Sequence, residues 1–155
     1  MNLSGTEIDP GHAGDVELRH ALERAGCRFT RQRSAVYAFL HSAHCHPTAE
    51  QVFHAVRRQI PKISLATVYK ALETLVDAHL AAKLADASGP ARYDCRTEAH
   101  YHFRCTDTGE VRDVPVPFDA ELLEKLNPQL VESLRQQGFH VTGHRLELFG
   151  HIQRK

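Results

Sequence analysis

Two histidines and two aspartates are spaced so that they could bind one metal ion. His100 and His102 are separated by a single residue, and this period of two places both side chains on one face of a β-strand. The segment 107–109, Asp-Thr-Gly, is a turn signal. A turn centred between residues 107 and 108 sets residue 113 opposite residue 102. We therefore expect Asp113 to share the face of the two histidines, and Asp94 to enter just before the strand.

Imidazoles and carboxylates together suit a divalent metal of intermediate softness, such as iron, manganese, zinc or nickel. The alternative is that these are solvated residues on the outer face of a hairpin, because His-x-His spacing alone is a weak signal. A dithiol zinc site is not indicated, since no Cys-x-x-Cys pair occurs among Cys27, Cys45, Cys95 and Cys105.

Charge is distributed unevenly along the chain of 155 residues, although 19 basic and 19 acidic residues cancel overall. Residues 19–70 hold nine Lys or Arg against two Asp or Glu, a net charge of +7. A basic region on a neutral chain indicates a polyanion partner. Nothing resembles a signal peptide or a membrane span, so we expect a cytoplasmic protein with reduced thiols and no membrane partner.

Helix signals dominate the basic region. Residues 1–14 read as a flexible tail, and Asp15 can cap a helix running to residue 25. Thr30 can cap the next helix, and Thr48 with Gln51 forms a capping box that starts a third at residue 49. Ser64 caps a fourth, and the two short helices joined by a tight turn predict a helix-turn-helix. The side chains expected to point outward from the last helix are Ala66, Thr67, Tyr69, Lys70 and Thr74.

These outward side chains are candidates for binding DNA. Tyr69 can contact a thymine methyl or a phosphate, and Lys70 a base edge or a phosphate, with Ser64 and Thr67 at the start of the same helix. A second candidate group consists of Arg28, Arg31 and Arg33. These arginines could reach phosphates or a minor groove, or they could form only a solvated face.

The rest of the chain alternates between strand and helix signals. Residues 80–94 predict a hairpin, the wing of a winged helix. Asp119 can cap an amphipathic segment that Pro128 divides and Gly138 ends, and residues 139–152 read as a final strand. The predicted fold is α+β, with a winged helix-turn-helix domain over residues 15–94 and a small α/β domain over 95–155. The second domain has too few strands to be stable alone, so we expect it to dimerise.

Six segments, in this order and at this spacing, resemble the ferric uptake regulator (Fur) family. They are Gly26-Cys27-Arg28-Phe29-Thr30-Arg31-Gln32-Arg33, His46-Pro47-Thr48-Ala49-Glu50, Ile63-Ser64-Leu65-Ala66-Thr67-Val68-Tyr69-Lys70, Arg92-Tyr93-Asp94, His100-Tyr101-His102 and His144-Arg145-Leu146-Glu147-Leu148-Phe149-Gly150. The resemblance implies a homodimeric, metal-activated repressor that binds an inverted-repeat operator in double-stranded DNA and is not an enzyme. It also implies that Tyr69 and Lys70 meet bases and that Arg28 enters the minor groove.

The resemblance further implies one regulatory divalent metal per subunit, Fe²⁺ or Mn²⁺, with Zn²⁺ a further option. The implied ligands are His46, Asp94, His100, His102 and Asp113, of which His46 comes from the resemblance alone. With Asp at both carboxylate positions, the chain is most similar to the peroxide-sensing subgroup. In that subgroup bound iron promotes oxidation of a ligand histidine, here His46 or His100, and DNA is released.

Other readings stay open. The chain could be a metal-availability sensor that controls metal uptake, a pH-responsive regulator with twelve histidines, or, remotely, a metallohydrolase, although no general base stands out. The chain also departs from the family, whose members usually hold a structural zinc with two Cys-x-x-Cys pairs. Only Cys105 of these four cysteines is present, and the other three positions are occupied by Thr108, Ile152 and Lys155. We therefore expect no structural four-cysteine zinc. Cys45 and Cys95 are expected to be small buried residues.

Overall fold

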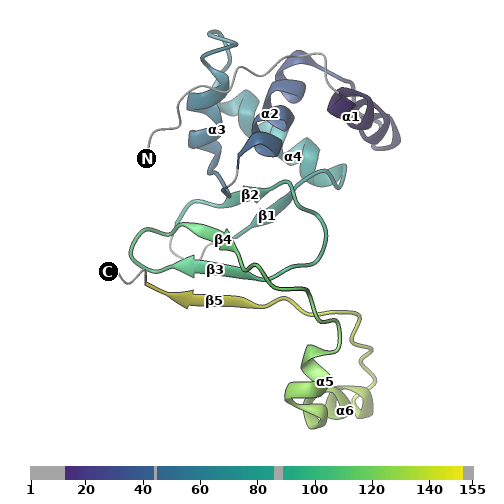
Figure 1. Ribbon diagram of the computed structural model, residues 1–155. Helices are drawn as coiled ribbons and strands as arrows, with labels where there is room; N and C mark the ends of the chain where they lie inside the picture. The colour runs from purple at the N-terminus through teal and green to yellow at the C-terminus, as the bar shows by residue number, and fades with distance from the viewer. Residues whose placement is uncertain (1–12, 44, 86–88, 152–155) are drawn as a thin grey trace. The chain divides into compact units, whose positions relative to one another are not determined.

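The computed structural model describes residues 13–43, 45–85 and 89–151 (Figure 1). The chain divides into two compact units, Met1–Thr97 and Glu98–Lys155, whereas the predicted boundary lies between residues 94 and 95. Most of the expected tail, residues 1–12, lies outside the described residues. Its last two residues, 13 and 14, are already helical. The expected capping by Asp15 is wrong, because Asp15 lies inside the first helical turn and accepts a hydrogen bond of 2.7 Å from the Ser34 hydroxyl.

Four helices form most of the first unit, and their starts follow the side chains that can cap them. They are α1 (Ala13–Arg24), α2 (Arg31–Ser42), α3 (Ala49–Val56) and α4 (Leu65–Asp77). Thr30, Thr48 and Ser64 are the N-caps of α2, α3 and α4, as predicted, and each accepts a hydrogen bond from a backbone N–H in the first turn. The predicted capping box at Thr48 and Gln51 is confirmed in both directions.

Apolar side chains at helical spacing pack these four helices around one core. Leu18 and Leu22 of α1 are fully buried, and so is Leu72 of α4. The core also includes Val36, Leu40, Val52, Val56, Val68, Leu75 and Tyr93. A buried leucine contributes roughly 2 kcal/mol through the hydrophobic effect, so this core can stabilise the fold of the first unit.

The predicted wing is an antiparallel hairpin of β1 (Ala82–Leu84) and β2 (Arg92–Asp94). The outer edge of β2 contacts the segment that leads into α3. Thr48 forms an isolated antiparallel bridge with Arg92, and the Tyr93 N–H donates to the Pro47 carbonyl over 2.9 Å. This pairing lays the segment just before α3 alongside β2.

The second unit is built on a three-stranded sheet, with β3 (His102–Cys105) between β4 (Val111–Asp113) and β5 (Glu147–Gly150). β3 pairs antiparallel with β4 and parallel with β5. His102 lies opposite Asp113, which confirms the predicted register. Gly109 closes the turn at φ +66°, a conformation that glycine adopts without steric cost.

Pro128 divides the helical segment of this unit into α5 (Leu122–Leu126) and α6 (Pro128–Gln136), as predicted. Pro128 is the first residue of α6, where its missing N–H costs no hydrogen bond. The final strand is shorter than predicted. Only Glu147–Gly150 of residues 139–151 is strand, because β3 pairs with it over four residues. Among the described residues, no helix is long and apolar enough to cross a membrane.

Candidate metal and DNA-binding sites

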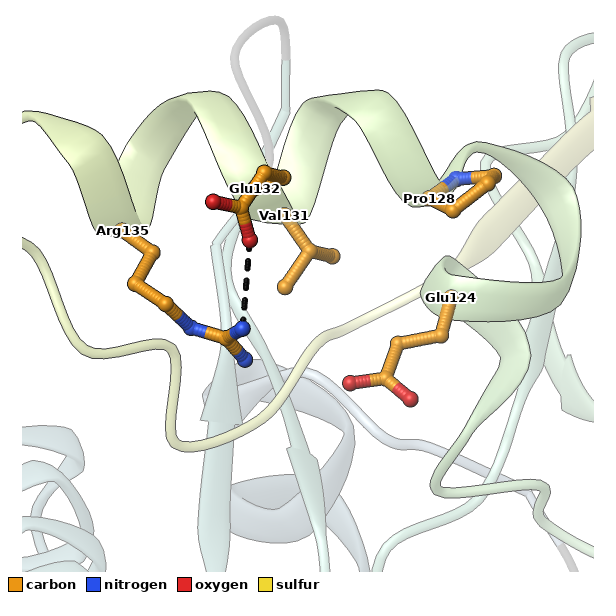
Figure 2. A pocket seen from close by; sticks show the side chains of 5 residues that line it. All are labelled: Glu124, Pro128, Val131, Glu132 and Arg135. Atoms are coloured by element: carbon orange, nitrogen blue, oxygen red, sulfur yellow. Dashed lines mark hydrogen bonds and ion pairs between the residues drawn. The ribbon is translucent and has the colours of Figure 1, made fainter.

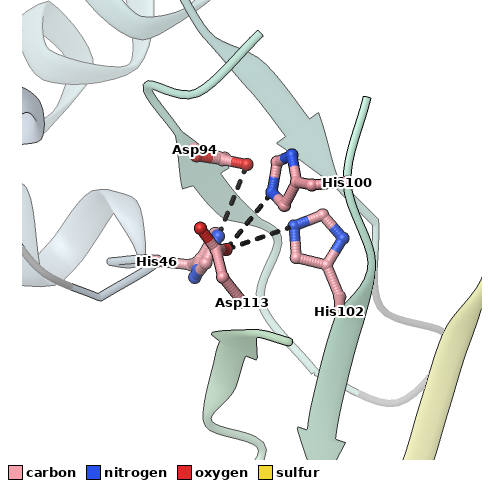
Figure 3. A group of neighbouring side chains, drawn as sticks. All are labelled: His46, Asp94, His100, His102 and Asp113. Atoms are coloured by element: carbon pink, nitrogen blue, oxygen red, sulfur yellow. Dashed lines mark ion pairs between the residues drawn. The ribbon is translucent and has the colours of Figure 1, made fainter. Parts of the chain in front are cut away.

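Within the first unit, His46 and Asp94 form a buried pair. The pairing of residues 47 and 48 with β2 brings His46 beside the end of that strand, and its Nε2 lies 3.4 Å from Asp94 Oδ2 (Figure 3). Both side chains are less than a tenth exposed. Two further contacts fix their positions. The Arg92 guanidinium donates to the His46 carbonyl over 2.9 Å, and the Arg96 N–H donates to Asp94 Oδ1 over 2.7 Å.

Within the second unit, two histidines and one aspartate converge. Asp113 Oδ1 lies 3.2 Å from His100 Nε2 and 3.8 Å from His102 Nε2 (Figure 3). The ring centroids of the two histidines are 4.3 Å apart. Candidate ligand atoms on the three residues lie within 4.8 Å of one another. His102 and Asp113 are brought together by the β3–β4 register, whereas His100 precedes β3 and is not part of the strand.

One hydrogen bond determines which nitrogen of His100 is available as a ligand. His100 Nδ1 lies 2.7 Å from the Glu98 carbonyl oxygen. A carbonyl can only accept a hydrogen bond, so Nδ1 carries the proton and Nε2 of the neutral ring keeps its lone pair. A carbonyl behind a ligand histidine is a common means of orienting the ring. Glu98 is not among the predicted site residues, because it contributes a backbone carbonyl, which every residue type has.

The predicted DNA-binding residues of α4 lie at its exposed start. Tyr69 and Lys70 are exposed and Thr67 is half-buried. Ser64 is occupied by capping, since its hydroxyl accepts the Thr67 N–H over 3.1 Å and lies 2.8 Å from the Thr67 hydroxyl. The expected exposure of Thr74 is wrong. Its hydroxyl is buried, donating to the Lys70 carbonyl over 2.8 Å.

The three arginines before α2 do not behave alike. Arg28 and Arg31 are exposed, as a DNA contact requires. Arg33 turns toward α4, where its Nη2 donates to Thr74 Oγ1 over 3.2 Å, and its Nη1 donates to the Arg28 carbonyl. Arg33 therefore connects the start of α2 to α4. These contacts support a structural role for Arg33 rather than the predicted contact with DNA.

Tyr69 has a hydrogen-bond partner that was not predicted from the sequence. Its hydroxyl donates to Glu50 Oε1 over 2.8 Å. Glu50 lies in the first turn of α3 and Tyr69 in α4, so the contact joins the two helices of the helix-turn-helix. No spacing rule predicts a contact between residues on different helices, and the charge of Glu50 gave no reason to place it beside a predicted DNA-binding residue.

The four cysteines differ in exposure. The expected burial of Cys45 is wrong, because it is exposed, and Cys95 is only half-buried. Cys105 is buried and is the single cysteine of the second unit by sequence. Thr108, which stands where a zinc-binding cysteine was considered, uses its hydroxyl to accept the Glu110 N–H over 3.2 Å and so stabilises the β3–β4 turn.

A hollow of about 300 Å³ lies beside α5 and α6 and contains none of the predicted site residues (Figure 2). It is lined by Glu124, Pro128, Val131, Glu132 and Arg135. The Arg135 guanidinium is paired with the Glu132 carboxylate over 3.1 Å. The hollow therefore offers no converging ligand set comparable with that of Asp113 and the two histidines.

The chain is similar to known proteins over most of its length. The model of the ferric uptake regulator family matches residues 24–149. The peroxide-responsive repressor PerR of Staphylococcus aureus is 35% identical over 130 residues, which cover 84% of this chain and 83% of that protein. The solved ferric uptake regulator of Vibrio cholerae is 27% identical with a TM-score of 0.68, covering 87% of this chain and 99% of that one. A zinc-bound manganese uptake regulator is 28% identical with a TM-score of 0.63, covering 88% and 98%.

Proposed function

Since the chain belongs to the ferric uptake regulator family, we propose that it is a metal-dependent repressor that binds an inverted-repeat operator as a homodimer. The observation that carries the proposal is the convergence of two buried histidines, His100 and His102, on Asp113, in a chain whose other unit presents an exposed helix start. The net charge of +7 over residues 19–70 supports DNA as the partner of that unit.

In this proposal one divalent ion is held by five ligands, namely His46, Asp94, His100, His102 and Asp113. Two carboxylates neutralise a divalent charge, and three neutral imidazoles complete a nitrogen and oxygen donor set that suits Fe²⁺, Mn²⁺ or Zn²⁺. The Glu98 carbonyl and the Arg96 N–H would hold His100 and Asp94 in ligating orientation. Metal binding would then join side chains from both units and so affect the DNA-binding unit.

We propose DNA contacts at two places in the first unit. Tyr69 and Lys70 would meet base edges from the start of α4, with Thr67 beside them, and their exposure supports this assignment. Arg28 and Arg31 would contact phosphates or the minor groove. Because Ser64 and Arg33 are occupied by internal hydrogen bonds, we assign them to positioning α4 rather than to DNA itself.

The signal that releases DNA is proposed to be peroxide. The identity with a peroxide-responsive repressor supports this choice. Hydrogen peroxide would be the two-electron oxidant: one of its oxygen atoms would be inserted into the imidazole of His46 or His100, and the other would leave as water. Bound iron would supply the redox catalysis. The second candidate is a sensor of metal availability, which the likeness to the Vibrio cholerae regulator and to a manganese uptake regulator favours.

The deciding experiment is operator binding under anaerobic conditions. The protein is loaded with Fe²⁺ or, separately, with Mn²⁺, and binding to a labelled duplex enriched from a randomised library is followed by fluorescence anisotropy. Dilute hydrogen peroxide is then added, and peptide masses are measured. We expect the iron form to release DNA with one added oxygen on His46 or His100, and the manganese form to stay bound. His20→Gln, an exposed histidine of α1, is the matched control and should behave as wild type.

Three other results lead to different conclusions. If both metal forms stay bound after peroxide and no histidine gains mass, the protein senses metal availability. If DNA binding is unchanged by metal removal, the metal is not regulatory. If no duplex is enriched with either metal, the assignment as a DNA-binding repressor is wrong.

A further inference from the structure

Glu50 holds the hydroxyl of the tyrosine that is proposed to read DNA. An ionised carboxylate has no proton to donate, so in the 2.8 Å contact the Tyr69 phenol is the donor and Glu50 Oε1 the acceptor. A backbone N–H and this phenol lower the pKa of Glu50, and the bond to Glu50 raises the pKa of Tyr69. At neutral pH Glu50 is therefore charged and Tyr69 keeps its proton.

This contact limits what Tyr69 can bind. A tyrosine hydroxyl has one proton, and once that proton is donated to Glu50 the oxygen can only accept. Phosphate oxygens also only accept, so the hydroxyl cannot form a hydrogen bond with a phosphate. The Glu50 carboxylate adds a negative charge at the same place, which disfavours a phosphate further. Base edges stay available, because adenine N6 and cytosine N4 donate in the major groove and thymine presents a methyl group.

We propose that Glu50 is a specificity-determining residue, which prevents Tyr69 from binding phosphate and so restricts it to base edges. This inference rests on the proposed DNA-binding function. It decides between the two contacts that the sequence allows for Tyr69, a thymine methyl or a phosphate. Without Glu50, the freed hydroxyl could donate to any phosphate, and a contact with the DNA backbone carries no sequence information.

Replacing Glu50 leaves the capping box and the buried core residues of α3 in place. The start of the helix is capped by two reciprocal hydrogen bonds, which join Thr48 and Gln51 only. The residues of α3 that bury side chains in the core are Ala49, Val52 and Val56. A loss of DNA specificity in a Glu50 variant can therefore be separated from unfolding by a thermal melt.

The test compares specific with non-specific binding. Full-length, Mn²⁺-loaded protein first enriches a site from a randomised duplex library. Anisotropy then gives the dissociation constants for that duplex and for a scrambled duplex of equal composition. The specificity ratio is the dissociation constant for the scrambled duplex divided by that for the enriched duplex. We expect Glu50→Ala to bind the scrambled duplex more tightly and so to lower this ratio about tenfold, the size of one base contact. Asp77→Asn, which removes an exposed charge of α4 far from Tyr69 in sequence, should leave the ratio unchanged.

Two further variants identify the hydrogen bond as the cause. Glu50→Gln keeps an acceptor oxygen and should retain most of the ratio. In a Tyr69→Phe background, which has no hydroxyl proton, Glu50→Ala should change the ratio by less than about twofold. The proposal is wrong if Glu50→Ala keeps the wild-type ratio, if Glu50→Gln falls as far as Glu50→Ala, or if the loss is as large in the Tyr69→Phe background. If wild-type protein enriches no site, the proposed function itself has failed.

Discussion

The first unit has a hydrophobic core of its own, whereas the second leaves most of its apolar side chains exposed or only half-buried. Four helices of the first unit bury leucines and valines that are fully inaccessible to solvent, such as Leu18 and Leu72. In the second unit α5 and α6 bury no residue, and Leu126, Leu130, Phe139, Leu148 and Phe149 are exposed. A small domain with several large apolar side chains exposed requires a covering surface to be stable. The difference indicates that the first unit can fold alone and that the second needs a partner, for which we propose a second copy of the chain.

Matched leucines give the largest test of this difference. Leu72 is 0% exposed in the first unit and Leu148 is 47% exposed in the second. We expect Leu72→Ala to lower the free energy of unfolding by about 3 kcal/mol, because it leaves a cavity. Leu148→Ala should cost less than about 1 kcal/mol at a protein concentration too low for association, since its side chain is half in water already. Urea unfolding followed by circular dichroism at one fixed concentration measures both. Equal losses would show that the second unit has a core comparable with that of the first.

The metal site tests whether the two units act together. If His46 of the first unit and His102 of the second bind one ion, His46→Ala and His102→Ala should each weaken Mn²⁺ binding about 100-fold or more. Anaerobic competition against a chromogenic chelator gives the affinities. His20→Ala and His140→Ala remove an exposed histidine from each unit and serve as controls. If His46→Ala binds Mn²⁺ as wild type while His102→Ala does not, the ion is bound by the second unit alone.

The exposed face of β5 gives the next effect in size. Phe149 is 65% exposed and lies in the unit expected to dimerise. Phe149→Glu should raise the dimer dissociation constant about 30-fold, the effect of losing one well-buried aromatic contact. Sedimentation velocity at micromolar concentration measures the change. Val16→Glu is the matched control, because Val16 is 59% exposed in the first unit and should not affect association. An unchanged dimer in Phe149→Glu would place the interface elsewhere.

Local signals in the sequence were sufficient to predict several elements. The capping box needs only Thr48 and Gln51, three residues apart, and the structure has both bonds. The pairing of His102 with Asp113 followed from the position of one turn, because the register of a hairpin is fixed by its loop. The alternation of residues 139–152 was misleading, since strand formation requires a paired neighbour and β3 pairs with only four of these residues.

Contacts between helices were beyond the reach of the sequence. Thr74 was expected to point outward because helical spacing alone does not show that Arg33, from another helix, reaches its hydroxyl. Glu50 was missed as the partner of Tyr69 for the same reason. Cys45 was expected to be buried because of its residue type, whereas it is exposed.

The smallest predicted effect concerns a helix end that occurs in both units. After α4 and after α6, the second residue beyond the helix has a positive φ, +58° at His79 and +86° at Gly138. In each case the following N–H donates to a carbonyl five residues back, from Leu80 to Leu75 and from Phe139 to Leu134, both over 2.9 Å. This is the Schellman motif, in which glycine is preferred because other residues are strained in the left-handed region.

The ends of α4 and α6 therefore differ at one equivalent position, and exchanging the residues should change stability in opposite directions. We expect His79→Gly to raise the free energy of unfolding by about 0.5 to 1 kcal/mol, since relief of strain exceeds the added entropy of the unfolded chain. Gly138→His should lower it by a similar amount. Thermal melts of both variants at one protein concentration provide the measurement. A loss of stability in His79→Gly would show that the His79 side chain makes a contribution larger than the strain of its backbone, and that the helix ends of the two units are not equivalent.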